Sequence, residues 1–167
     1  MSDKENKAII EVFRELEQGY KQGDVDRCIA TFYEENVSLI GTAVDEVRLG
    51  NEEVRYQLQR DIEQTSFRDL SFSEFQFFFH GNISYSVSDV NFIGETVEGE
   101  NFVMKGRSSA MLEKNDGKWL FRHVHSSVPD YDASEGNSFA GNLNKMISLF
   151  LKFRMDQFRG TSTGKAE

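Results

Sequence analysis

The stretch LSFSEFQFFFHGNISYSVSDVNFI, residues 70–93, decides the predicted fold. Apolar and polar residues alternate on both sides of Gly81-Asn82, a dipeptide that suits a two-residue hairpin turn. The alternation shifts by one residue once in each half, after Phe72 and again after Val87. Such a shift would turn the apolar face outward unless a β-bulge absorbed it, and a bulge also bends the strand. We therefore expect two long antiparallel strands, a bulge in each, and strong curvature.

Helical spacing of apolar residues dominates before this hairpin, and alternation continues after it. The predicted elements are an amphipathic helix over about 3–22, a short helix capped by Asp24, an extended piece at 37–41, a crossing segment at 42–49, a helix from 51, strands over 70–80, 83–93, 101–114 and 118–128, and an amphipathic helix over 137–158. Three helices, an antiparallel meander and one further helix predict an α+β protein.

Composition excludes several classes of function. The net charge is -9 and the 19 basic residues form no cluster, which argues against a nucleic-acid partner. Cys28 is the only cysteine, so no internal disulfide is possible. No apolar segment follows the N-terminal MSDKENK, so we do not expect secretion, and no apolar run reaches about 18 residues. We expect a cytoplasmic protein with no membrane contact.

Three further segments occur in order: GDVDRCIATFYEENVSLIG (23–41), DEVRLGNEEVRYQLQRD (45–61) and EKNDGKWLFRHVHSSVP (113–129). Together with the element order, they resemble the SnoaL-like branch of the nuclear transport factor 2-like superfamily over about residues 5–130. The resemblance implies a cone, in which a curved sheet wraps around the first helix and leaves a pocket, and it implies a homodimer. The fold hosts many enzymes and binding modules, so it assigns no chemistry by itself.

The resemblance also divides the chain. Residues 1–132 would form the cone domain, 133–159 an appended amphipathic helix, and 160–167 a disordered tail. An apolar stripe on the appended helix favours packing on its own domain or on a partner over lying on a membrane.

The ketosteroid isomerases of this superfamily need a tyrosine, a carboxylate base and a protonated aspartate. Aligned on the similar segments, these positions fall on Leu16, on Gly41, and on Ser108 or Ser109. None of these residues can act as the base or supply the acidic hydrogen-bond donors, which argues against this isomerase chemistry.

A few polar residues remain as candidates for the cavity. Asp45 is a candidate base, or it simply caps backbone N–H groups, which we favour. Arg122 is a candidate for binding a carboxylate ligand through its guanidinium, with a salt bridge to an acidic residue as the alternative. The full set of predicted ligand-binding residues is Tyr20, Tyr33, Asp45, Arg48, Arg122 and Ser126.

His123 and His125 lie two apart on a predicted strand and therefore share a face, which alternation also assigns to Trp119 and Phe121. A metal would need a third ligand, and His80 is the only other histidine. We favour an outer sheet face that packs against a second subunit, with the histidines as weaker candidates for catalysis. On the preceding strand, alternation places Arg107 on that outer face and the row Met104, Gly106, Ser108, Ala110 and Leu112 on a cavity wall.

Three hypotheses follow. The first, which we favour, is a homodimeric module without a catalytic set or cofactor that binds a small, mainly apolar, possibly acidic molecule. The second is an isomerase, cyclase or hydratase that uses Asp45 or a histidine as base, with Arg122 or Tyr33 as stabiliser. The third is a regulatory or assembly domain that docks through its C-terminal helix.

Overall fold

The computed structural model of the chain describes residues 3–133 and 135–136. It divides into two compact units, Met1–Pro129 and Asp130–Glu167. The predicted helix over 137–158 and the predicted tail lie outside the described residues. In the second unit, the described residues form a turn in which the Ala133 N–H donates to the Asp130 carbonyl at 3.1 Å. The fold below is that of the first unit.

The described part of the first unit contains three helices and six strands. In chain order they are α1 (Asp3–Gln22), α2 (Val25–Ile29), β1 (Ser38–Ile40), β2 (Val47–Leu49), α3 (Asn51–Glu63), β3 (Thr65–His80), β4 (Ile83–Thr96), β5 (Asn101–Asn115) and β6 (Lys118–Ser127). As predicted, α1 spans 3–22, and the Asp24 carboxylate caps α2 by accepting the Arg27 N–H at 2.9 Å. No helix within these bounds is both long and apolar enough to cross a membrane.

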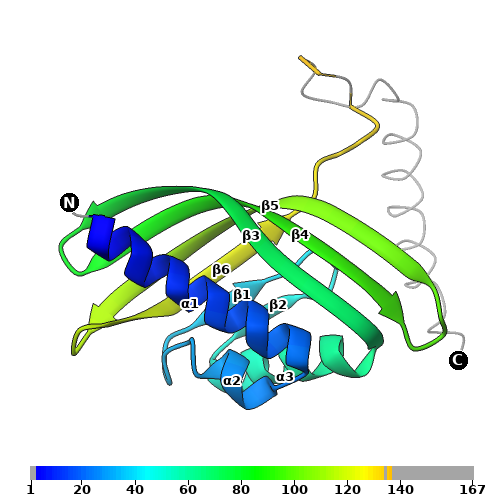
Figure 1. Cartoon of the computed structure of the whole chain (residues 1–167), viewed down its shortest axis with the longest axis horizontal. Helices are drawn as coiled ribbons and strands as arrows, with labels where there is room; N and C mark the ends of the chain where they lie inside the picture. Colours follow the sequence, from blue (N-terminus) through cyan, green and yellow to red (C-terminus); the bar gives the residue numbers. More distant parts are fainter. Residues whose placement is uncertain (1–2, 134, 137–167) are drawn as a thin grey trace, which may run out of the picture. The chain divides into compact units, whose positions relative to one another are not determined.

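The strands form one sheet in the order β2-β1-β6-β5-β4-β3. Neighbours pair antiparallel except β1 and β6, which are parallel. Figure 1 shows the sheet curving around α1, with α2 and α3 gathered at one end of that helix. This is the α+β arrangement of helices on a strongly curved sheet that the sequence predicts.

The core lies between α1 and the inner face of the sheet. Ile9, Phe13 and Leu16 recur at helical spacing and are buried. The Phe13 ring meets the rings of Phe72 and Phe121 edge-on, with centroids 5.0 and 4.9 Å apart. Burial of each large side chain stabilises the fold by about 1.5–3 kcal/mol, so this contact anchors α1 to both β3 and β6.

The predicted bulge in the first strand of the hairpin is confirmed. On β3, Ser73 pairs with Asp89 and Gln76 with Val87, so two residues of β3 oppose one of β4. Glu74, inside the bulge, has a φ of 53°. The bulge restores the inward orientation of the apolar residues that follow, Phe75, Phe77 and Phe79, which pack against the core.

The predicted bulge in the second strand is wrong. β4 pairs with β5 without a break along its length, so the even-numbered residues of β4 face inward from one end of the strand to the other. The inner face carries the buried Ser84, Ser86 and Ser88, whereas Tyr85 is exposed on the outer face. The large phenylalanines of β3 and α1 already fill this end of the interior, so the adjoining strand needs small side chains there.

β6 contains a bulge that alternation did not predict. Met111 pairs with His123 but Leu112 pairs with Phe121, which leaves Arg122 as the extra residue. Trp119 and Phe121 therefore face the core, and the Trp119 indole N–H donates to the Glu5 carboxylate at 2.8 Å. The predicted placement of Trp119 on the outer face beside the histidines is wrong, because the bulge reverses the parity between them.

His123 and His125 follow this bulge and lie on the outer face, opposite the buried Val124. Arg107 lies on the same outer face, because its neighbours Gly106 and Ser108 face inward. The predicted inner row of β5 is thus present. The homodimer contact through this face stays a prediction.

Candidate functional site

A cavity of about 160 Å³ lies between α1, α3, β1 and the inner face of the sheet. Thr42 and Val128 line it and are exposed, so the cavity opens to solvent on their side. The Thr42 hydroxyl contacts the Met104 sulfur at 3.5 Å near this opening. Most of the wall is apolar and comes from helices and strands alike, including Leu16, Leu58, Phe72, Val90, Phe92 and Val124.

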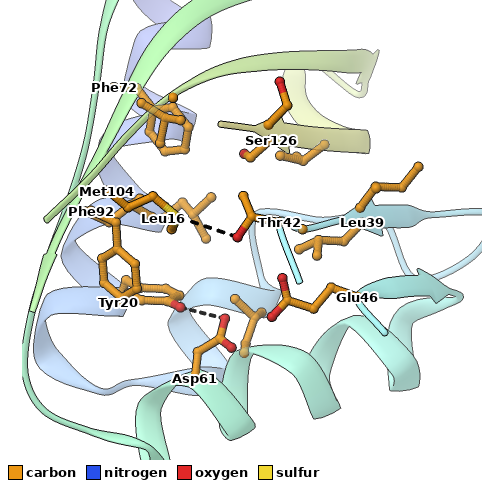
Figure 2. Close-up of a pocket in the computed structure, with 18 of the residues that line it drawn as sticks. Leu16, Tyr20, Leu39, Thr42, Glu46, Asp61, Phe72, Phe92, Met104 and Ser126 are labelled. Carbon is orange, nitrogen blue, oxygen red and sulfur yellow. Dashed lines mark hydrogen bonds between the residues drawn. The ribbon is translucent and has the colours of Figure 1, made fainter. Parts of the chain in front are cut away.

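The ionisable side chains that line the cavity lie at one end of it, where Figure 2 shows Tyr20, Asp61 and Glu46 together. The Tyr20 hydroxyl donates to Asp61 Oδ2 at 2.6 Å. The Gln57 amide donates to Asp61 Oδ1 at 2.7 Å and to Glu46 Oε1 at 3.1 Å. One amide thus bridges two carboxyl groups that belong to different elements.

Helical periodicity explains how α3 supplies this end. Val54 and Leu58 are buried on its inner face, and Asp61 follows Leu58 by three residues on the same face. Tyr20 follows Leu16 by four residues on α1 in the same way. The Phe92 ring meets the Tyr20 ring edge-on at 5.4 Å and supports it from the sheet.

Burial raises the pKa of Asp61 from 3.8 to about 6, and the negative charge of Glu46 adds to the rise. The hydrogen bonds from Tyr20 and Gln57 and the nearby charge of Arg60 oppose the rise, because they stabilise the ionised form. Burial, reinforced by the Asp61 charge, also raises the pKa of Tyr20 well above its usual value. Tyr20 is therefore a neutral hydrogen-bond donor.

Two arginines hold the remaining acidic groups beside the cavity. Arg60 donates to Glu46 at 2.9 Å and to Asp45 at 2.6 Å, and its hydrogen bond lowers the pKa of Asp45. Arg48 donates to the Gln57 oxygen at 3.0 Å. Glu46 thus has a cationic partner, whereas no ion pair within the described part of the chain involves Asp61.

The structure brings together some of the predicted ligand-binding residues. Tyr20 and Ser126 line the cavity. Arg48 lies behind its wall as the partner of Gln57. Asp45 is exposed on the turn before β2 and pairs with Arg60, so it is outside the cavity.

Tyr33 and Arg122 lie in a different place, a more open and more polar hollow formed by α2, the following loop and β6. Arg122 donates to Glu113 at 2.8 Å and to the Glu35 carbonyl at 2.6 Å. Its guanidinium lies over the Tyr33 ring, 3.4 Å from the centroid. These contacts match the salt-bridge alternative for Arg122.

The histidine pair lies on the outer face, away from the cavity. His123 Nδ1 is 2.8 Å from the Ser38 hydroxyl. The pKa of His123 is lowered, mainly because the ring is partly buried and to a smaller extent because of the charge of His125. The two rings are 6.5 Å apart. Among residues 3–133 and 135–136, no group of three or more His, Cys, Asp or Glu side chains is arranged to hold a metal.

The structure also shows where the residues aligned with the catalytic groups of the ketosteroid isomerases lie. Leu16 and Gly41 line the cavity without an ionisable group. Ser108 is buried on the inner face of β5 and donates to the His125 carbonyl at 3.2 Å, while Ser109 pairs with His125 on the outer side.

Sequence reasoning missed Asp61 and Glu46. Asp61 lies in the quoted segment 45–61, and its spacing from Val54 and Leu58 was the available signal that it faces inward. Glu46 follows Asp45 in an irregular segment, where no periodicity distinguishes an inward residue from an outward one. Its carboxylate is held by the Ala43 N–H at 2.9 Å.

A family model described as a SnoaL-like domain matches residues 9–131, which include every residue of the cavity. No curated protein matches the sequence.

Solved structures share the fold. A nuclear transport factor 2-like superfamily protein from Salmonella enterica serovar Typhimurium LT2 is 19% identical, with a TM-score of 0.71 over 80% of this chain and 96% of that one. A proposed scytalone dehydratase from Novosphingobium aromaticivorans DSM 12444 is 17% identical, with a TM-score of 0.70 over 81% and 95%. A protein of unknown function from Nostoc punctiforme is 17% identical, with a TM-score of 0.66 over 78% and 96%. These likenesses show the cone-shaped fold.

Proposed function

We propose that this chain, which belongs to the SnoaL-like domain family, binds a small and mainly apolar molecule in the cavity between α1, α3 and the sheet. One observation carries the proposal: the cavity has apolar walls and confines its ionisable groups to one end (Figure 2). Apolar walls with a few convergent polar groups are typical of small-molecule sites.

The volume limits the size of the molecule. About 160 Å³ is close to the roughly 150 Å³ of an engineered apolar cavity that accepts benzene. A single six-membered ring with one short substituent therefore fits, and the substituent extends toward Tyr20 and Asp61. A fused four-ring molecule exceeds this volume.

The polar end also limits the chemistry of that substituent. Asp61 and Glu46 are both acidic, so an acidic ligand would meet repulsion at this end. Arg122, the residue predicted to bind a carboxylate, is committed to Glu113 and lies outside the cavity. The ligand we propose therefore carries a hydrogen-bond donor and no negative charge.

Titration calorimetry with toluene, benzyl alcohol and cyclohexanol tests the proposal. We expect saturable binding of at least one of these probes, lost in Val90→Trp because the indole would occupy the cavity. The matched control is Val87→Trp on the outer face of the same strand, which should bind as the unaltered protein does. Absence of saturable binding by all three probes, or equal binding by Val90→Trp in a folded state, would refute the proposal.

A further inference from the structure

The charges around the cavity do not balance at Asp61. Tyr20, Glu46 and Asp61 are the ionisable residues that line the cavity, and no lysine, arginine or histidine in the described part of the chain lines it. Within the described part of the chain, a positive charge that meets the ligand must therefore come from behind the wall, or the ligand must carry it.

The two arginines behind the polar end of the cavity, Arg48 and Arg60, are already engaged. Arg60 bonds Glu46 at 2.9 Å and Asp45 at 2.6 Å. Arg48 bonds Gln57 and lies 3.8 Å from Asp45. The two positive charges of Arg48 and Arg60 are thus matched by the two negative charges of Asp45 and Glu46.

The hydrogen-bond partners of Asp61 are both neutral, the Tyr20 hydroxyl and the Gln57 amide, while Arg60 acts on it only through space. Buried carboxylates in proteins are normally paired with a cation, because their removal from water is costly. Hydrogen bonds from neutral donors offset only part of this cost. The site therefore has a place for one positive charge that the described protein side chains do not supply.

The surrounding walls suit an organic cation better than a hydrated ion. The Tyr20 and Phe92 rings meet edge-on beside Asp61, and Phe72 also lines the cavity. Aromatic faces attract ammonium groups, and apolar walls favour a ligand that is mostly hydrocarbon. A bare metal ion would instead need several more oxygen ligands than this end provides.

We propose that the ligand is a small organic cation, a single ring or an equivalent apolar group bearing a protonated amine, and that Asp61 pairs with the ammonium. This inference rests on the proposed binding function and specifies its ligand class. Tyr20 and Gln57 act as positioning residues, because their hydrogen bonds hold both oxygens of the Asp61 carboxylate. Glu46 is already paired with Arg60, so the negative charge left without an ion pair at this end of the cavity is that of Asp61.

Three probes of equal size separate the possibilities: benzylammonium, benzyl alcohol and benzoate, titrated at constant ionic strength. Hydrogen bonds to charged groups contribute more than neutral ones, so we expect benzylammonium to bind roughly tenfold more tightly than benzyl alcohol. Benzoate should bind most weakly. In Asp61→Asn, the preference for the cation should fall to about one while benzyl alcohol still binds.

Asp89→Asn is the matched control, because it removes the same charge from an exposed position on the outer face of β4. It should keep the preference for the cation.

If Asp61→Asn does not fold, the unaltered protein still gives a test, since benzylammonium should bind more tightly as the pH rises from about 5 to about 7 and Asp61 ionises. Benzyl alcohol should show no such rise. The groups that face Asp61 are Tyr20 from α1, Glu46 from the turn before β2, and Gln57 and Arg60 from α3 itself.

The outcomes are distinguishable. Benzyl alcohol or benzoate binding at least as tightly as benzylammonium would overturn the inference and leave the proposed binding function intact. A preference for the cation that survives in Asp61→Asn would overturn it as well. Failure of every probe would remove the binding function, and the inference with it.

Discussion

Replacement of Asp61 by asparagine should change how the stability of the protein depends on pH. Burial gives Asp61 a pKa of about 6 in the folded protein, against 3.8 for an exposed carboxyl group. Between these values the folded state holds one more proton than the unfolded state, so the free energy of unfolding falls as the pH rises. Two pH units, at about 1.4 kcal/mol each, give a loss of about 3 kcal/mol.

The asparagine amide keeps the size of the carboxyl group but does not titrate. The free energy of unfolding of Asp61→Asn minus that of the unaltered protein should therefore rise by about 3 kcal/mol from about pH 4 to about pH 7. Urea titrations of both proteins at several pH values measure this difference, and every other titrating group cancels from it. The exposed Asp89→Asn serves as the control and should give a flat difference.

A difference that stays constant over this range would refute the reasoning, because it would mean that Asp61 has the same proton affinity in both states. A difference that falls with pH would refute it more strongly. That result would require an ionised Asp61 to stabilise the fold, as a salt-bridged carboxylate does.

Three further changes test particular contacts. Tyr20→Phe removes the 2.6 Å hydrogen bond to Asp61 and should lower the free energy of unfolding by about 2 kcal/mol at neutral pH, measured by urea titration. The loss should be smaller when Asp61→Asn is already present, because the asparagine carbonyl accepts only a neutral hydrogen bond from Tyr20. Gly106→Ala should cost about 1–3 kcal/mol by the same measurement, because the added Cβ would lie 2.4 Å from the Ser127 carbonyl oxygen; an unchanged midpoint would contradict the close strand approach. Arg122→Ala should cost about 1–2 kcal/mol and leave probe binding in the cavity unaltered in calorimetry, since its ion pair and ring contact lie outside the cavity.

Much of the fold could be predicted because its apolar residues follow simple periods. The spacing along residues 3–22 defines α1, and the parity shift after Phe72 marks a real bulge. The shift after Val87 does not, because Tyr85 is apolar on the outer face while Ser86 is buried on the inner one. Alternation shows that two faces differ, but the volume left by neighbouring strands decides which face is buried.

The candidate site was less predictable for a related reason. The bulge that contains Arg122 comes from pairing with β5, which local sequence does not encode, and it separates Trp119 from the histidines. Asp61 carries a helical signal, but a lone aspartate near the end of a helix is usually exposed. Its importance comes from contacts with Tyr20, 41 residues away in the chain.

The parallel pairing of β1 with β6 has a consequence for how the chain assembles. Leu39, which lines the cavity, pairs with Val124, so this side of the cavity is complete only when nearly the whole first unit has been synthesised. Contacts of such long sequence separation form late, since a large loop must close before they contribute. A ribosome-bound fragment that ends before β6 therefore lacks a finished cavity, and the proposed ligand would stabilise the protein only after β6 has joined the sheet.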